Sequence, residues 1–291
     1  MTENKIRKII VGTDFNELAV AALRFSAAIA ARAGTELVVV YADTFEPPPE
    51  FTAAQVKHIV EMIEVSKSRT REQLEHHIRK NVPDGVVWKA VVAEGLPASS
   101  IASIADAEHA DFIAVGTHGR GGVQRLLMGS VAETILREAH VPVLTVRSAA
   151  AAGAVRRVLC PVNGTQTAAI AAGRAAMIAE AVGAELTLLH VSAPGETSID
   201  IERLLRPGQP PPAFLHRTAP HDGTAAAILK LEDGYDLIVI GAEHKAFRDV
   251  TIFGATITSV TRHARTPVLV VTRQGEETRP PATRRAVALT E

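Results

Sequence analysis

Short apolar runs alternate with longer segments of helical spacing along the first half of the chain. The runs are rich in Val, Ile and Leu and cover residues 6–13, 36–42, 86–93, 111–116 and 142–147. Between them, apolar residues recur every three or four positions over 15–33, 52–81, 98–109 and 129–139. Continuous apolar runs are typical of parallel strands that helices cover on both faces. The pattern predicts a five-stranded, doubly wound α/β domain.

The same pattern returns in the second half, so the chain contains an internal repeat. The matching segments are 7–14 with 156–163, 33–42 with 182–191, 110–119 with 235–244, and 141–148 with 266–273. The second copy is shorter between its second and fourth strands, where the first copy has the predicted helix 52–81. Prolines and glycines in residues 194–212 allow at most a short helix there.

These matches predict two tandem domains, residues 1–148 and 155–273, joined by the small-residue segment SAAAAGAV. Each domain is expected to end in an apolar strand, VPVLTV or TPVLVV, at a sheet edge. Exposed apolar edges tend to be paired. Residues 274–291 are polar and contain prolines, which predicts a disordered tail.

A glycine-rich stretch follows the predicted strand 111–116 and precedes the helix that starts near residue 129. Gly116, Gly119 and Gly129 are followed by Ser130. Glycines let backbone N–H groups approach an anion, and a helix N-terminus adds free N–H groups. The spacing differs from the P-loop and from the Rossmann fingerprint. Strand, glycine loop and helix together favour a phosphate-binding site.

Composition narrows the function classes. The chain has 291 residues, a net charge of -1 and 4% aromatic residues. Such a chain has no global basic field for nucleic acid or anionic membranes, and few rings for base stacking. No secretion signal and no apolar stretch of about 20 residues is recognisable, so a cytoplasmic location is expected. The single cysteine, Cys160, lies in an apolar run and is expected to be a buried residue.

Three segments together resemble the universal stress protein family. They are IIVGTD at residues 9–14, VAEGLPASSI at 92–101 and VGTHGRGGVQRLLMGSVAETILREAHVPVLTV at 115–146. The resemblance covers nearly all of residues 5–148 and, more weakly, 155–273. It implies two flavodoxin-like domains, of which the first has the motif of the ATP-binding branch. It also implies that the final strands of the two domains pair, here within one chain, and that the protein forms a homodimer.

The resemblance assigns ATP contacts to individual residues of the first copy. Asp14, beside Thr13, is expected to contact ribose or adenine, and the backbone of Ala42 to meet adenine. The alternative for Asp14 is a helix cap, and for Ala42 a plain strand end. The phosphates are assigned to Gly116, Gly119, Arg120, Gly129, Ser130 and Val131. Arg120 could instead be a solvated surface charge, and Ser130 could also cap its own helix.

The second copy departs from the motif at its polar positions. Asn163 stands where Asp14 is expected, His244 replaces the middle glycine, and Ala255 replaces the serine. Losing two or three polar contacts at roughly 1–3 kcal/mol each weakens binding by orders of magnitude. The sequence predicts that the second domain binds ATP poorly and serves mainly for assembly.

No catalytic motif and no metal-binding motif stands out, so bound Mg²⁺ is expected to arrive with the nucleotide. The leading hypothesis is an ATP-binding protein of stress response or signalling, with no enzymatic activity beyond slow ATP hydrolysis. The alternative is a slow ATPase or nucleotidyl-transferring enzyme on the same fold. A phospho-receiver domain is disfavoured, because Ala93-Glu94-Gly95 stands where that fold needs its aspartate.

Overall fold

The structure is a computed structural model. It describes residues 5–43, 53–117, 128–151, 153–195, 199, 204, 212–219, 223–243, 245–247 and 250–272. For residues 43, 53–64, 151, 245–247 and 250–252 it describes the backbone alone. The predicted tail 274–291 lies outside the described residues.

The first half alternates strands and helices as the sequence pattern predicts. Its elements are β1 (Lys8–Gly12), α1 (Glu17–Ala33), β2 (Glu36–Asp43), α2 (Ala53–Asn81), β3 (Trp88–Glu94), α3 (Pro97–Ala107), β4 (Phe112–Gly116), α4 (Ser130–Glu138) and β5 (Val143–Val146). The strands lie in the order 3-2-1-4-5, and all neighbours are parallel. This order differs from that of flavodoxin itself but matches the first five strands of the doubly wound dinucleotide fold.

The second half repeats this arrangement after the short helix η1 (Ala149–Ala151). Its elements are β6 (Arg157–Val162), α5 (Gln166–Val182), β7 (Glu185–Ser192), β8 (Ala213–Thr218), α6 (Thr224–Leu229), η4 (Glu232–Gly234), β9 (Leu237–Ala242), β10 (Lys245–Phe247), β11 (Val250–Ile252), α7 (Ala255–His263) and β12 (Val268–Thr272). Strands 8, 7, 6, 9 and 12 correspond to strands 3, 2, 1, 4 and 5 of the first half.

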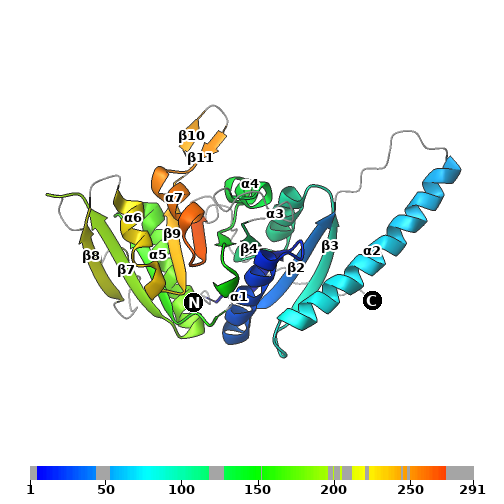
Figure 1. Cartoon of the computed structure of the whole chain (residues 1–291), viewed down its shortest axis with the longest axis horizontal. Helices are drawn as coiled ribbons and strands as arrows, with labels where there is room; N and C mark the ends of the chain where they lie inside the picture. Colours follow the sequence, from blue (N-terminus) through cyan, green and yellow to red (C-terminus); the bar gives the residue numbers. More distant parts are fainter. Residues whose placement is uncertain are drawn as a thin grey trace, which may run out of the picture.

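The two halves join through their last strands. β12 pairs with β5 in antiparallel register, with Leu269 opposite Leu144. The result is one ten-stranded, mostly parallel sheet (Figure 1). The apolar edge strands of the sequence therefore pair with each other inside a single chain.

The hydrophobic cores of the halves are continuous across this seam. One buried cluster lies on the side of α1 and α5 and includes Phe25, Leu144 and Val271. The other lies on the side of α3, α4, α6 and α7 and includes Ile113, Val143 and Val268. Arg32 at the end of α1 also donates a 3.0 Å hydrogen bond to the carbonyl of Val182 at the end of α5. Continuous packing on both faces is expected to make the halves unfold together.

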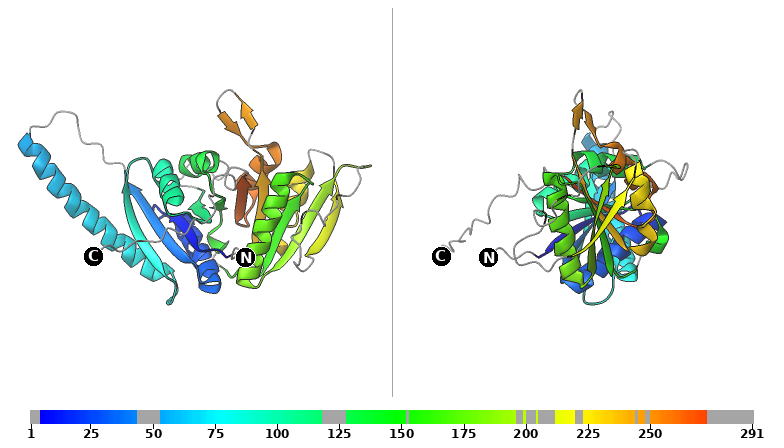
Figure 2. Two further views of the ribbon diagram at one scale, coloured as in Figure 1. Left: turned by 180° about the vertical axis from the view of Figure 1, so that it is seen from behind. Right: turned by 90° about the vertical axis from the view of Figure 1, so that its left-hand side faces the viewer.

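Two features distinguish the halves. The long helix α2 runs along the outer side of β3 in the first half (Figure 1), whereas no helix lies among the described residues between β7 and β8. In the second half, β10 and β11 form an antiparallel hairpin that projects away from the sheet (Figure 2). The sequence did not predict this hairpin. Among the described residues, no helix combines the length and apolarity that crossing a membrane requires.

Candidate functional site

The first half contains a cavity at the point where its strand order reverses. β1 pairs with β2 on one side and β4 on the other, so the chain leaves these strands in opposite directions. Ligands of open α/β sheets bind at the carboxyl ends of the strands at such a point. The cavity here has a volume of about 260 Å³ and is lined by Gly12, Thr13, Asp14, Asn16, Ala19, Ala42, Pro97, Ile101, Val115, Gly116, Thr117, Gly129, Ser130, Val131 and Ala132.

Asp14 is held in place by the residue that caps helix α1. Its Oδ1 accepts a 3.1 Å hydrogen bond from the backbone N–H of Asn16, and its Oδ2 accepts a 2.9 Å bond from the Asn16 side chain. Asn16 in turn accepts from the N–H of Ala19 and is the N-cap of α1. The cap alternative for Asp14 is therefore wrong, because Asn16 fills that role. The carboxylate of Asp14 is half-buried and lines the cavity.

Phe15 fixes the turn between β1 and α1. Its φ of 66° is a left-handed conformation that side chains other than glycine rarely adopt. The ring packs against Tyr41 at 5.1 Å and edge-on against His77 at 5.0 Å, centroid to centroid. Gly164, at the equivalent turn of the second half, has a φ of 75°. Both halves thus use the same backbone turn, and aromatic packing offsets its strain in the first half.

The N-terminus of α4 opens on the cavity. Gly129 is its N-cap residue, and no side chain among the described residues caps the helix. The first turn therefore presents free backbone N–H groups at Ser130, Val131 and Ala132, all of which line the cavity. Free N–H groups and the positive end of the helix dipole favour an anion at this position.

Gly116 has a structural role that the sequence did not reveal. A Cβ built on it would lie 2.7 Å from the carbonyl carbon of Leu18 and 2.8 Å from the nitrogen of Ala19. The glycine therefore allows β4 to pack against the backbone of α1, in addition to lining the cavity. Gly241 has the same role in the second half, where its Cβ would lie 2.7 Å from the carbonyl oxygen of Thr167.

The structure brings together most of the residues that the sequence singled out. The cavity is lined by Thr13, Asp14, Ala42, Gly116, Gly129, Ser130 and Val131. Gly119 and Arg120 lie outside the described residues. Sequence reasoning missed Gly12, Asn16 and Thr117, although each lies within two residues of a predicted site residue. It also missed Pro97 and Ile101, whose signal is their place in the segment VAEGLPASSI.

Comparison with known proteins shows which family this chain belongs to. The model described as "Universal stress protein family" matches residues 5–147, 154–209 and 203–272. The chain belongs to this family. The family match does not test the predicted domain boundaries 1–148 and 155–273, which stay predictions.

Individual universal stress proteins resemble one half or the whole of this chain. One from Methanocaldococcus jannaschii is 32% identical over 146 residues, which is 50% of this chain and 84% of that protein. One from Mycobacterium tuberculosis is 30% identical over 139 residues, 48% of this chain and 45% of that protein. A solved universal stress protein from Archaeoglobus fulgidus superimposes with a TM-score of 0.67 at 23% identity, covering 94% of this chain and all of that one. That structure supports the tandem fold alone.

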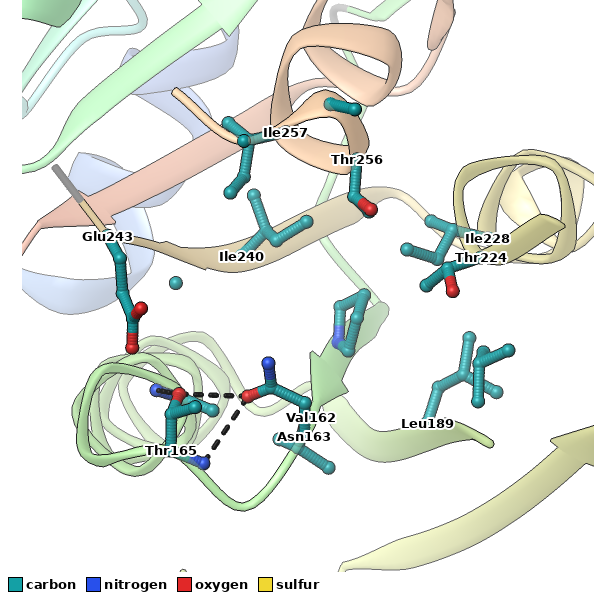
Figure 3. Close-up of a pocket in the computed structure, with 16 residues that line it drawn as sticks. Val162, Asn163, Thr165, Leu189, Thr224, Ile228, Ile240, Glu243, Thr256 and Ile257 are labelled. Atoms are coloured by element: carbon teal, nitrogen blue, oxygen red, sulfur yellow. Dashed lines mark hydrogen bonds between the residues drawn. The ribbon is translucent and has the colours of Figure 1, made fainter. Parts of the chain in front are cut away.

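The second half of this universal stress protein has its own cavity at the equivalent switch point, between β6 and β9. Its volume is about 310 Å³ (Figure 3), and it is lined by Pro161, Val162, Asn163, Thr165, Ala168, Leu189, Val191, Thr224, Ile228, Ile240, Gly241, Glu243, Gly254, Ala255, Thr256 and Ile257. Asn163 accepts hydrogen bonds from the backbone and hydroxyl of Thr165, which caps α5. The half predicted to serve mainly for assembly therefore keeps a hollow of similar size with different chemistry.

Metal-binding groups are sparse in the described part of the chain. No three His, Cys, Asp or Glu side chains cluster there closely enough to hold a metal ion. Of the described residues that line the first cavity, Asp14 alone has an acidic side chain.

Proposed function

We propose that this universal stress protein binds ATP in the first-half cavity and acts in stress response or signalling as a binding protein. The observation that carries the proposal is the meeting, at one switch point, of a half-buried carboxylate and an uncapped helix N-terminus. The two groups suit opposite ends of a nucleotide, since a carboxylate accepts hydrogen bonds from ribose hydroxyls and free N–H groups donate them to phosphate oxygens.

Each part of the nucleotide has a partner in this arrangement. The Asp14 carboxylate would accept from the ribose, and the backbone at Ala42 would meet adenine. The N–H groups of Ser130 and Val131 would donate to phosphate, with Gly119 and Arg120 of the glycine-rich loop as further phosphate partners. Mg²⁺ would arrive with the nucleotide and keep mostly water ligands.

The proposal is tested first by identifying the natural ligand. The full chain is purified without added nucleotide and denatured, and the released small molecules are identified by mass spectrometry. ATP released in near-stoichiometric amount supports the proposal. The variants Asp14→Ala and Gly119→His are then compared with wild type by calorimetric titration. If both variants bind ATP as tightly as wild type, the site assignment is wrong.

The same preparation tests whether the protein is an enzyme. We propose at most slow hydrolysis, because none of the described residues that line the first cavity stands out as one that orients an attacking water. Turnover above about one per second, a common enzymatic rate, would make the protein an ATPase instead.

Assembly and location complete the proposal. The strands β5 and β12 are already paired within the chain. A homodimer must therefore use another surface, and sedimentation of the purified chain gives its mass directly. A cytoplasmic location is part of the same proposal and can be checked by fractionating cells that express the tagged protein.

A further inference from the structure

Three rings pack around the turn that follows Asp14. Phe15 adopts its left-handed φ of 66° in this turn, and its ring centroid lies 5.1 Å from that of Tyr41 and 5.0 Å from that of His77. Tyr41 belongs to β2, and His77 belongs to the long helix α2 (Figure 1). The rings therefore connect a helix on the outer side of the sheet with the first cavity, which Asp14 lines.

The conformation of Phe15 decides where the Asp14 carboxylate lies. Asn16 donates two hydrogen bonds to that carboxylate, from its backbone at 3.1 Å and from its side chain at 2.9 Å. Phe15 is the residue between these partners, so a change of its backbone to a negative φ would separate them. The left-handed φ is unfavourable for phenylalanine and persists only where the surroundings support it. Packing on Tyr41 and His77 supplies that support.

His77 lies against Phe15 in a setting that suits only the neutral imidazole. Leu74 and Ile78 of the same helix are 0% exposed and hold α2 against the core. The Nε2 atom of His77 is buried and has no hydrogen-bond partner among the described residues. A protonated imidazole carries an N–H on both nitrogens, so its Nε2–H would be buried without an acceptor.

The charges around His77 also disfavour its protonated form. Burial lowers the pKa of its imidazole from the ordinary value of 6.5. The charges of three neighbours lower this pKa further, Lys80 and His76 on α2 itself and Arg24 on α1. From β2 the nearby titratable group is Tyr41, which packs on the same phenyl ring. No acidic side chain of the described residues is among the groups that shift the pKa of His77.

We propose that His77 is a positioning residue of the ATP site and that it supports the Asp14 turn only while its imidazole is neutral. On protonation the imidazolium turns from the Phe15 ring to solvent, the turn relaxes, and Asp14 leaves the position from which it accepts the ribose hydroxyls. This role rests on the proposed function, because it concerns the affinity for ATP. Since protonation favours the released arrangement, ATP affinity is full above about pH 7 and falls as the pH drops below about 6.5.

Calorimetric titration with ATP at about pH 7.5 and about pH 5.5 tests this role, after circular dichroism has shown that each variant is folded. His77→Ala removes the ring and should weaken ATP binding about tenfold already at the higher pH. His77→Phe keeps a ring against Phe15 and cannot be protonated, so it should restore wild-type affinity there. Because protonation of the ATP phosphates affects every variant alike, the quantity compared is the ratio of the affinities at the two pH values. This ratio should be at least about threefold larger for wild type than for H77F.

Two control variants separate His77 from other effects. H76Q removes the exposed histidine beside it in sequence and keeps all three rings, so it should have the wild-type ratio. V131F places a larger side chain at the wall of the first cavity and gives the background from any ATP bound elsewhere. Equal ratios for wild type and H77F would overturn the proposal, and so would an H77F variant that binds ATP as weakly as H77A at the higher pH.

A variant of the turn itself tests the same role by another route. Gly164 makes the equivalent turn of the second half, with a φ of 75° that costs glycine little. F15G copies that turn, so the backbone no longer needs His77. Its ratio should be as small as that of H77F, although His77 is still present. A ratio as large as that of wild type would overturn the proposal.

A measurement without ATP separates this role from the proposed function. Nuclear magnetic resonance of the unliganded chain follows the amide signals of Phe15 and Asn16 as the pH is lowered. In wild type these signals should shift together with the titration of the His77 ring, and in H77F they should not. Signals that stay still in wild type would overturn the role of His77, whatever ATP does. Shifting signals in a chain that binds no ATP would overturn the proposed function alone.

Discussion

The switch points of the two halves have the same skeleton and different chemistry. At Gly116 and at Gly241 a strand lies so close to a helix backbone that an added Cβ would come within 2.7 Å of it, so each glycine permits the packing of its half. Asp14 faces one cavity, whereas Asn163 lies in the other with Glu243 at its mouth. The comparison teaches that Gly116 and Gly241 report on packing, and that the polar residues that line each cavity report on the ligand.

The largest expected effect concerns the seam that unites the halves. Leu144 and Leu269 face each other across β5 and β12, at 0% and 2% exposure. Truncating either to alanine is expected to cost about 2–5 kcal/mol of unfolding free energy, because each leaves a cavity in a continuous core. Urea denaturation followed by circular dichroism should show one shared transition, with a similar loss for both variants. Two separate transitions, with only one affected, would contradict a common core.

The shared glycines give the next largest effect. Gly116→Ala and Gly241→Ala are each expected to cost about 1–3 kcal/mol, since the added methyl group meets helix backbone. Gly254→Ala is the control, because a Cβ there meets nothing within 4 Å and its φ of -60° suits any residue. Thermal melts should place the control close to wild type and both test variants well below it. A G241A variant as stable as the control would show that the second half does not need its glycine.

Exchanging Asp14, which follows β1, and Asn163, which follows β6, tests whether the two cavities differ in their affinity for ATP. Asp14→Asn keeps the shape of the side chain and removes the charge that accepts from ribose, so ATP affinity should fall about tenfold. Asn163→Asp is the reciprocal variant, and it should leave ATP binding of the whole chain unchanged. Isothermal titration measures both. An ATP affinity that depends equally on the two positions would place nucleotide in both halves.

The smallest expected effect is a change in the stability of the protein at acid pH, which arises from an ion-pair group in the first half alone. Hydrogen bonds and charge from Lys8 and Lys89 lower the pKa of Glu108 from 4.5 to about 2. Because the folded pKa is depressed, this stabilisation is complete above about pH 4.5 and is lost as the pH falls through about 2. Glu108→Gln should flatten that part of the stability profile, by no more than about 1 kcal/mol for a partly exposed pair. An unchanged acid profile would show that the ion pairs contribute nothing.

Most of the fold follows from the hydrophobic pattern. The helix predicted at 52–81 is found at Ala53–Asn81, and the strand predicted at 142–147 is found at Val143–Val146. Hydrophobic periodicity predicts such helices and strands because their formation depends on the burial of their apolar residues. The β10–β11 hairpin was missed because its two strands have 3 residues each, too few for an alternating hydrophobic pattern to be recognised.

The site was predictable where it depends on residue type and unpredictable where it depends on packing. Asp14 and Ser130 were singled out because strand ends and helix starts converge at one edge of the sheet, and Ala42 because of the resemblance to the family. The left-handed φ of Phe15 was not predictable, since its support comes from Tyr41 and from the distant His77. The cavity of the second half was missed for a related reason. The sequence shows that polar residues of the motif are replaced there, but such replacements do not fill a cavity that the backbone creates.

The central claim is that one chain holds one ATP, in its first half. Calorimetric titration of the full chain with ATP measures this stoichiometry directly, and the same titration of V131F identifies the half. The account predicts one equivalent of ATP for wild type and none for V131F. Two equivalents for wild type, or one equivalent that survives in V131F, would contradict it.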